Sequence, residues 1–127
     1  MVGIVIVSHS ENLAKSVVEL TTMMAKGVPI EPAGGLEDGS FGTSYDRIRD
    51  AIDKVYSDDG VIVLMDMGSS VLTTQSVIEM EEDGKKVEMV DCPLVEGAVS
   101  ASLDSSLGES MEQIIDDLKT VATTPKM

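Results

Sequence analysis

The 127-residue chain contains no tryptophan, one cysteine, one histidine and only three aromatic residues, at Phe41, Tyr45 and Tyr56. A single cysteine excludes an internal disulfide. One histidine and one cysteine also leave a zinc site short of its usual ligands, so we expect no metal site. The scarcity of aromatic rings leaves few platforms on which nucleobases could stack.

Positive charge is scarce as well. The chain has nine lysines and arginines and 23 aspartates and glutamates, which gives a formal net charge of −14. Such a chain is repelled by phosphate backbones and anionic membranes, so we expect neither nucleic acid nor a membrane as partner, and a basic protein surface fits better. No apolar run approaches the roughly 20 residues that span a bilayer, and the first run lacks the basic flank of a signal peptide. We therefore expect one cytoplasmic domain covering residues 1–127.

Short apolar runs alternate with amphipathic segments. Strands are predicted at residues 2–7, 30–33, 60–66 and 87–92, the last with the alternation of an edge strand. Between them, the spacing predicts a helix capped by Ser10, a second capped by Thr43 or Ser44, and a third over residues 69–80. A turn is predicted at residues 81–86. Two further helices follow, divided near Gly108.

The expected inward faces of these helices can be read from their apolar residues. They are Leu13, Val17, Leu20 and Met24 in the first; Ile48, Ala51, Ile52 and Val55 in the second; Val95, Ala98 and Leu103 in the fourth; and Met111, Ile114, Ile115, Leu118 and Val121 in the fifth. Two overlapping capping boxes, Ser106 with Glu109 and Ser110 with Gln113, mark the start of the fifth.

The order of elements predicts an α/β fold, a doubly wound open parallel sheet of four strands in the order 2-1-3-4 with helices on both faces. The first and third strands are then neighbours at the point where the strand order reverses. Ligands of such folds bind beyond the carboxyl ends of the strands at that point.

The only histidine lies at that place. The stretch "GIVIVSHS" ends the first strand with His9, and Asp66 ends the third strand. A carboxylate bonded to one ring nitrogen fixes the tautomer and leaves the other nitrogen with a free lone pair. Together, His9 and Asp66 are candidates for a nucleophilic imidazole and the group that orients it.

Two segments nearby could hold an anion. Free backbone N–H groups at the start of the third helix favour negative charge, and the glycine-rich stretch before the second helix adds N–H groups and hydroxyls. The candidate phosphate-binding residues are Gly39, Ser40 and Thr43 in the glycine-rich stretch and Gly68, Ser69 and Ser70 at the helix. A phosphoryl group carried by His9 is the anion that these features suit best.

Four stretches, "GIVIVSHS", "AGGLEDGSFGTS", "VIVLMDMGSS" and "CPLVEGAV", resemble the phosphotransfer subunits of phosphoenolpyruvate-dependent dihydroxyacetone kinases, within the mannose-type enzyme IIA family of the phosphotransferase system. The resemblance extends along the chain. It implies that Nε2 of His9 accepts a phosphoryl group from the histidine-containing phosphocarrier protein while Nδ1 faces Asp66. The group would pass to ADP on the separate nucleotide-binding subunit of the kinase. This chain would bind no cofactor itself, would form a homodimer, and would receive phosphate from a separate donor protein.

Other readings stay open on the residues alone. A mannose-type sugar transport enzyme IIA would pass the group to a IIB protein, and a regulatory binding module would pass it to nothing. A receiver domain phosphorylated on aspartate lacks its acidic pair, because "SHS" follows the first strand. A serine hydrolase lacks its G-x-S-x-G elbow, because "MGSSV" has no final glycine.

Overall fold

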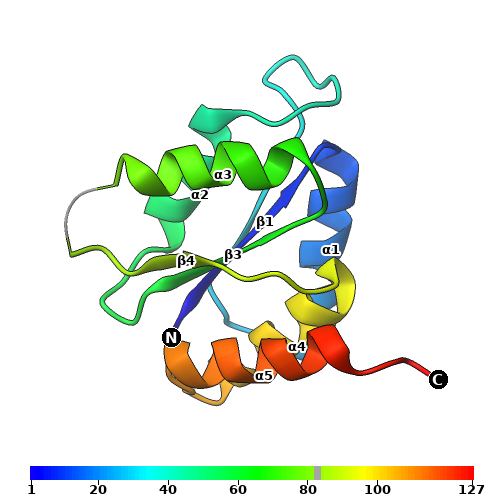
Figure 1. Cartoon of the computed structure of the whole chain (residues 1–127), viewed down its shortest axis with the longest axis vertical. Helices are drawn as coiled ribbons and strands as arrows, with labels where there is room; N and C mark the ends of the chain where they lie inside the picture. Colours follow the sequence, from blue (N-terminus) through cyan, green and yellow to red (C-terminus); the bar gives the residue numbers. More distant parts are fainter. Residues whose placement is uncertain (82–83) are drawn as a thin grey trace.

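The computed structural model describes residues 1–81 and 84–127, which are built around a four-stranded sheet (Figure 1). Its strands are β1 (Gly3–Ser8), β2 (Ile30–Gly34), β3 (Val61–Met65) and β4 (Val87–Met89). All neighbouring pairs are parallel, in the order β2-β1-β3-β4. The predicted order is confirmed, and the two strands that lead into His9 and Asp66 lie side by side.

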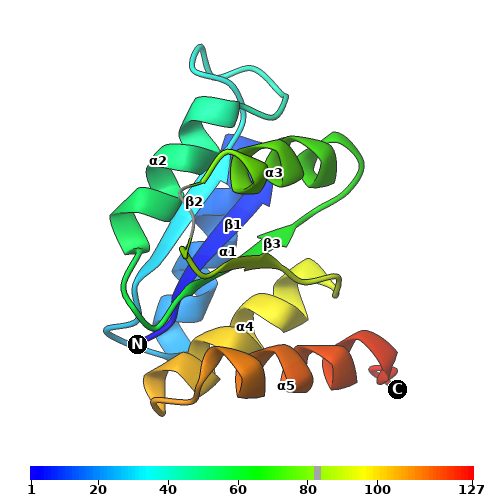
Figure 2. The ribbon, with the colours of Figure 1, turned by 60° about the vertical axis from the view of Figure 1, so that its left-hand side comes forward.

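Five helices cover the sheet on its two faces. They are α1 (Glu11–Met24), α2 (Tyr45–Val55), α3 (Ser69–Glu79), α4 (Leu94–Ser106) and α5 (Met111–Thr123). Helices α2 and α3 lie on one side, and α4 and α5 lie on the other (Figure 2). Helix α1 packs with α4 and α5. No helix within residues 1–81 and 84–127 is long and apolar enough to span a membrane.

Alternation along the strands explains why both faces are covered. Successive side chains of a strand point to opposite faces, so a strand that is apolar throughout needs packing on both. In β1, Ile4 and Ile6 pack against α1, α4 and α5, whereas Val5 and Val7 pack against α2 and α3. The same division separates the residues of β3. The continuous apolar runs are therefore the direct cause of the doubly wound arrangement.

The predicted inward face of α1 was wrong in its details. The buried residues are Ala14, Val17 and Thr21, and of the four predicted positions only Val17 is among them. Leu13 and Met24 are exposed. Small side chains face inward because α1 approaches the sheet closely: a Cβ added to Gly34 of β2 would lie 2.8 Å from the Ala14 Cβ and 2.4 Å from the Ser10 carbonyl oxygen.

Helix α4 follows the same rule. Val95 and Leu103, predicted to face the core, are exposed, and only Ala98 of the predicted set is buried. Small residues occupy the inner face instead: Gly97, Ala98, Ala101, Ser102 and Ser105. The Ser105 hydroxyl donates to the Val2 carbonyl at 2.7 Å, which attaches the helix to the start of the sheet.

The edge of the sheet is shorter than the sequence predicted. Strand β4 ends at Met89 rather than at Cys92, although the Val90 amide still donates to the Val63 carbonyl at 3.2 Å. Of the predicted turn at residues 81–86, residues 82 and 83 lie outside the described residues.

Neither predicted capping box forms in full, and only the Ser110 half of the second box is present. Ser106 lies inside the last turn of α4, where its hydroxyl donates to the Leu103 carbonyl. Ser110 is the N-cap of α5 and accepts a hydrogen bond from the Gln113 amide at 3.2 Å. The Gln113 side chain turns away from the cap and donates to Asp117.

The two serines therefore offer a matched pair for measurement. We expect Ser110→Ala to lower the free energy of unfolding by about 1 kcal/mol, the usual loss when a capping hydroxyl is removed. Ser106→Ala should change it by less than about 0.5 kcal/mol, because its hydroxyl caps nothing. Urea unfolding of both variants measures the difference. Equal losses would show that Ser110 contributes no cap.

Candidate active site

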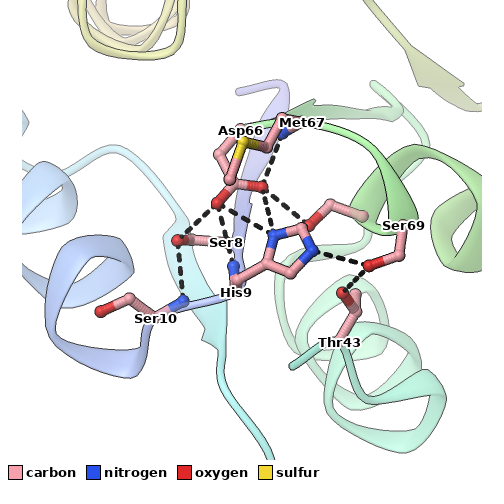
Figure 3. Close-up of polar contacts among 8 residues, drawn as sticks. Ser8, His9, Ser10, Thr43, Asp66, Met67 and Ser69 are labelled. Carbon is pink, nitrogen blue, oxygen red and sulfur yellow. Dashed lines mark hydrogen bonds and ion pairs between the residues drawn. The ribbon is translucent and has the colours of Figure 1, made fainter. Parts of the chain in front are cut away.

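His9 and Asp66 meet at the carboxyl edge of the sheet (Figure 3). Strands β1 and β3 are in register up to Val7 and Met65, so the residues that follow them emerge together. The imidazole Nδ1 lies 3.1 Å from Asp66 Oδ1 and 3.3 Å from Oδ2. The predicted juxtaposition of the two side chains is thus present.

The Asp66 carboxylate collects hydrogen bonds from several donors besides the ring. Its Oδ2 accepts from the Ser8 hydroxyl at 2.9 Å and from the His9 amide at 3.0 Å. Its Oδ1 accepts from the Met67 amide at 2.7 Å and the Ser70 hydroxyl at 2.8 Å. Donors on both strand ends and on α3 therefore hold the carboxylate in one orientation.

These bonds decide the charge of Asp66. Burial alone would raise the pKa of this carboxyl, but the donors from His9, Ser70, Met67 and Ser8 outweigh burial and lower the pKa to about 2. An ionised carboxylate can only accept hydrogen bonds. Nδ1 of a neutral imidazole must then carry the proton, and the lone pair is on Nε2.

The Nε2 side of the ring faces hydroxyls at the open side of the site. Ser69 Oγ, on the first residue of α3, lies 2.6 Å from Nε2, and Thr43 Oγ1 lies 3.1 Å from Ser69 Oγ. The His9 side chain keeps 27% of its surface exposed. Nε2 is therefore held by polar neighbours and still lies near solvent.

The second half of the glycine-rich loop supplies the hydrogen bonds that reach His9 and its surroundings. The Gly42 amide donates to the His9 carbonyl at 2.9 Å, and Thr43 joins the hydroxyls beside Nε2. Gly39 and Ser40 are exposed residues of the loop between β2 and α2, and this loop projects beyond the sheet (Figure 1). The Gly39 amide bonds to the Leu36 carbonyl, and the amide and hydroxyl of Ser40 bond to Asp38, so this turn is closed on itself.

The other three predicted residues, at the start of α3, have different positions relative to His9. Gly68 is the N-cap, and its φ of +48° suits a residue without a side chain. Within the described part of the chain, the amides of Gly68 and Ser69 have no acceptor. Ser70 is fully buried, and its hydroxyl lies on the Nδ1 side of the ring, 3.2 Å from that nitrogen.

Two residues of the site were missed in the sequence. Ser8 is fully buried, donates to Asp66 and accepts from the Ser10 amide at 3.0 Å. A serine at the end of a buried strand requires a hydrogen-bond partner, and this requirement could have indicated its role. The amide of Gly42 carried no such signal, because its contact depends on the path of the loop.

Ser70 gives a test of the carboxylate network. We expect Ser70→Ala to raise the pKa of Asp66 from about 2 towards its ordinary 3.8, because one donor to the charged form is lost. Since the folded-state pKa of Asp66 is lowered, its contribution to stability is present above about pH 4 and is lost as the pH falls towards 2. The variant should therefore lose this contribution at a higher pH. Carboxyl ¹³C titration of Asp66 measures the shift, with Ser76→Ala, on the outer side of α3, as control; an unchanged pKa would contradict the network.

The lone cysteine makes none of the hydrogen bonds described for this site. Burial, followed by the nearby charges of Asp91 and Glu96, raises the pKa of the Cys92 thiol to about 11. Its Sγ fills the space beside Gly97, where an added Cβ would lie 2.4 Å away. A protonated, packed thiol fills space in the structure and is a poor nucleophile.

The sequence is similar to those of known proteins. Residues 3–115 match the family described as "PTS system fructose IIA component". A phosphoryl donor subunit of a phosphoenolpyruvate-dependent dihydroxyacetone kinase from Listeria innocua is 36% identical, with 94% of each chain covered. The phosphotransferase subunit of the Lactococcus lactis enzyme is 37% identical, with 92% of this chain and 93% of that one covered. The Escherichia coli donor subunit is 36% identical, and the match covers 92% of this chain but only 26% of that longer protein.

Solved structures agree with the sequence matches. A crystal structure of a protein of unknown function covers 100% of this chain with a TM-score of 0.86 and 26% identity. A phosphotransferase system component EIIA from Streptococcus agalactiae covers 96% of it with a TM-score of 0.68, and at 20% identity it shows the fold alone. The chain thus belongs to the mannose-type enzyme IIA family, in the group of phosphoryl donor subunits of phosphoenolpyruvate-dependent dihydroxyacetone kinases.

Proposed function

We propose that this chain is a phosphoryl carrier: His9 accepts a phosphoryl group on Nε2 from a histidine-containing phosphocarrier protein and passes it to ADP bound on the nucleotide-binding subunit of dihydroxyacetone kinase. The relatives named as phosphoryl donor subunits support the kinase as the destination. The same proposal includes a cytoplasmic location and a homodimer. Light scattering of the purified protein tests the homodimer directly, because it measures the molar mass in solution.

One observation carries the proposal above the others. The chain's only imidazole is bonded through Nδ1 to an ionised aspartate, and its Nε2 faces hydroxyls near solvent. A binding module has no need for a ring whose tautomer is fixed in this way. A carrier needs it, because a nucleophilic nitrogen must present its lone pair to a partner.

The transfer step requires little movement of protons. The Nε2 lone pair attacks phosphorus, the bond between phosphorus and the donor's ring nitrogen breaks, and its electron pair stays on that nitrogen. The proton on Nδ1 remains in place. The imidazole becomes positively charged when it takes the phosphoryl group, and the Asp66 carboxylate at 3.1 Å offsets that charge. In the onward transfer, an oxygen of ADP attacks phosphorus, the bond between phosphorus and Nε2 breaks, and the electron pair returns to Nε2.

Cations that screen the phosphoryl charge are proposed to come from the partners. Arg47, near the amino end of α2, donates to the Gly34 carbonyl at 3.0 Å and lies 3.8 Å from Glu11. Both contacts are made by Nη1 and direct this nitrogen of the guanidinium towards β2 and α1. The net charge of −14 attracts a basic partner surface to this protein and accelerates the encounter at low ionic strength.

Reconstitution tests the proposal. The protein is incubated with ³²P-labelled phosphoenolpyruvate, enzyme I and the phosphocarrier protein, separated from them, and divided among three acceptors. These are the nucleotide-binding kinase subunit with ADP, the same subunit without ADP, and a mannose-type IIB protein. We expect loss of label from this chain and formation of labelled ATP only in the first.

Each other outcome has a definite meaning. Rapid transfer to the IIB protein with none to ADP would assign the chain to sugar transport. Labelling that no acceptor discharges would remove the kinase assignment while leaving His9 as the phosphorylated residue. Absence of labelling would leave the regulatory binding module as the function.

A further inference from the structure

The hydroxyls beside Nε2 form a chain whose direction is fixed. In the neutral imidazole Nδ1 carries the ring proton, since the ionised Asp66 can only accept, and Nε2 then accepts as well. The Ser69 hydroxyl, 2.6 Å away, must donate its single proton to Nε2. Its oxygen is then free to accept, and Thr43 must be the donor across their 3.1 Å separation.

This arrangement blocks the atom that must react. The Nε2 lone pair is occupied by the Ser69 proton, so nothing can be attacked until that bond opens. A phosphorus atom on Nε2 would stand one single-bond length from the nitrogen, inside the 2.6 Å at which Ser69 Oγ now lies. The hydroxyl and the phosphoryl group cannot occupy the same place, so Ser69 must move when His9 is phosphorylated.

Ser69 is free to make this movement. It is the exposed first residue of α3, and its amide has no acceptor in the described part of the chain. A serine side chain has three staggered rotamers, and an exposed one exchanges between them on a picosecond to nanosecond timescale. Rotation carries the hydroxyl off the lone pair without displacing the helix.

We propose that Ser69 is a catalytic residue that alternates between two acceptors: its hydroxyl donates to Nε2 in the unphosphorylated protein and to a phosphoryl oxygen once His9 is phosphorylated, with Thr43 as the donor that holds it in the first position. This proposal rests on phosphorylation of His9 at Nε2. It explains why Ser69 and Thr43 meet here although 26 residues separate them. Hydroxyl donors bond well to phosphoryl oxygens, because a charged acceptor strengthens the bond.

The first experiment uses the unphosphorylated protein and needs no partner. Imidazole ¹⁵N spectra are recorded for the wild type, Ser69→Ala and Ser76→Ala, the last being a serine of the same helix that bonds only to the Leu72 carbonyl. We expect the Nε2 resonance to move downfield in Ser69→Ala alone, towards a nitrogen that accepts no hydrogen bond, while Nδ1 remains unchanged. An Nε2 resonance that does not move would overturn the resting half of the proposal.

The second experiment tests the phosphorylated half. Phosphoramidate serves as a small donor: Nε2 attacks its phosphorus, the P–N bond breaks, and ammonia leaves with the electron pair. The half-life of the resulting phosphohistidine is then followed by ³¹P spectroscopy. We expect Ser69→Ala to shorten it about tenfold, the order expected for losing one hydrogen bond to an anion. Ser69→Thr, which keeps the hydroxyl, should restore it.

The outcomes separate this proposal from the proposed function. Equal half-lives in the wild type and Ser69→Ala would show that Ser69 does not hold the phosphoryl group. Phosphorylation at Nδ1, or none in a folded protein, would contradict the carrier chemistry itself. The ¹⁵N spectra of the unphosphorylated protein decide the resting contact in either case.

Discussion

Replacement of His9 by glutamine is expected to abolish phosphorylation completely. Glutamine has a similar reach and can still donate to Asp66, but its amide nitrogen has no available lone pair to attack phosphorus. Since His9 is the only histidine, no other residue of this chain can form phosphohistidine. Labelling from phosphoenolpyruvate through the phosphocarrier protein should fall from stoichiometric to background.

The chemistry of the label provides the control. A phosphohistidine is lost in acid and survives in base, a phosphoserine survives acid, and an acyl phosphate on aspartate is lost in both. Wild-type label should be acid-labile and base-stable. Acid-labile, base-stable label that persists in His9→Gln would contradict a carrier histidine, and label lost in both conditions would transfer the role to a carboxylate such as Asp66. Circular dichroism of the variant checks that it is folded.

The sheet order could be predicted because several physical rules point to the same arrangement. Continuous apolar strands need helices on both faces, and right-handed crossovers then leave few possible orders. The same reasoning placed His9 beside Asp66, since side chains at the carboxyl ends of adjacent parallel strands emerge together. Both results follow from regular geometry that repeats along the chain.

The inward faces of α1 and α4 could not be predicted from hydrophobicity. Close approach to the sheet and to each other selects small residues such as Ala14, Gly97 and Ala101, so larger apolar residues such as Leu13 and Leu103 remain outside. The helical spacing shows that a helix has one apolar face. It does not decide which of two adjacent rows of residues points to the core. Interhelical distance, which depends on the whole fold, decides between the alternatives.

The loop contacts were beyond prediction for a different reason. Glycine content indicated a segment able to present its amides, and Thr43 does join the hydroxyls beside Nε2. Hydrogen bonds within the loop decide which amides remain free: those of Gly39 and Ser40 are used by Leu36 and Asp38. Such short-range competition does not follow a periodic pattern and becomes visible only in the folded structure.

The second large effect is expected at Asp66. We predict that Asp66→Asn lowers the initial rate of His9 phosphorylation by about 10²- to 10⁴-fold, comparable to removal of the orienting carboxylate from other histidine-dependent enzymes. An asparagine amide can donate to Nδ1, which shifts the ring proton to Nε2 and blocks the reacting lone pair. Its NH₂ group would also face donors such as the Ser8 hydroxyl and the His9 amide.

Asp46→Asn is the matched control for this change. Asp46 is an exposed carboxylate on the first turn of α2 that forms a surface ion pair with Arg49 at 3.3 Å. Its replacement removes the same charge. An exposed ion pair of this kind contributes about 0–1 kcal/mol to folding stability, so the variant should remain folded and its rate of phosphorylation should be unchanged. Both variants are compared at one concentration of phosphorylated carrier protein, after urea unfolding confirms that each is folded. If folded Asp66→Asn reacted within about threefold of Asp46→Asn, a gap of less than about 0.7 kcal/mol in activation free energy, Asp66 would not be setting the tautomer of His9.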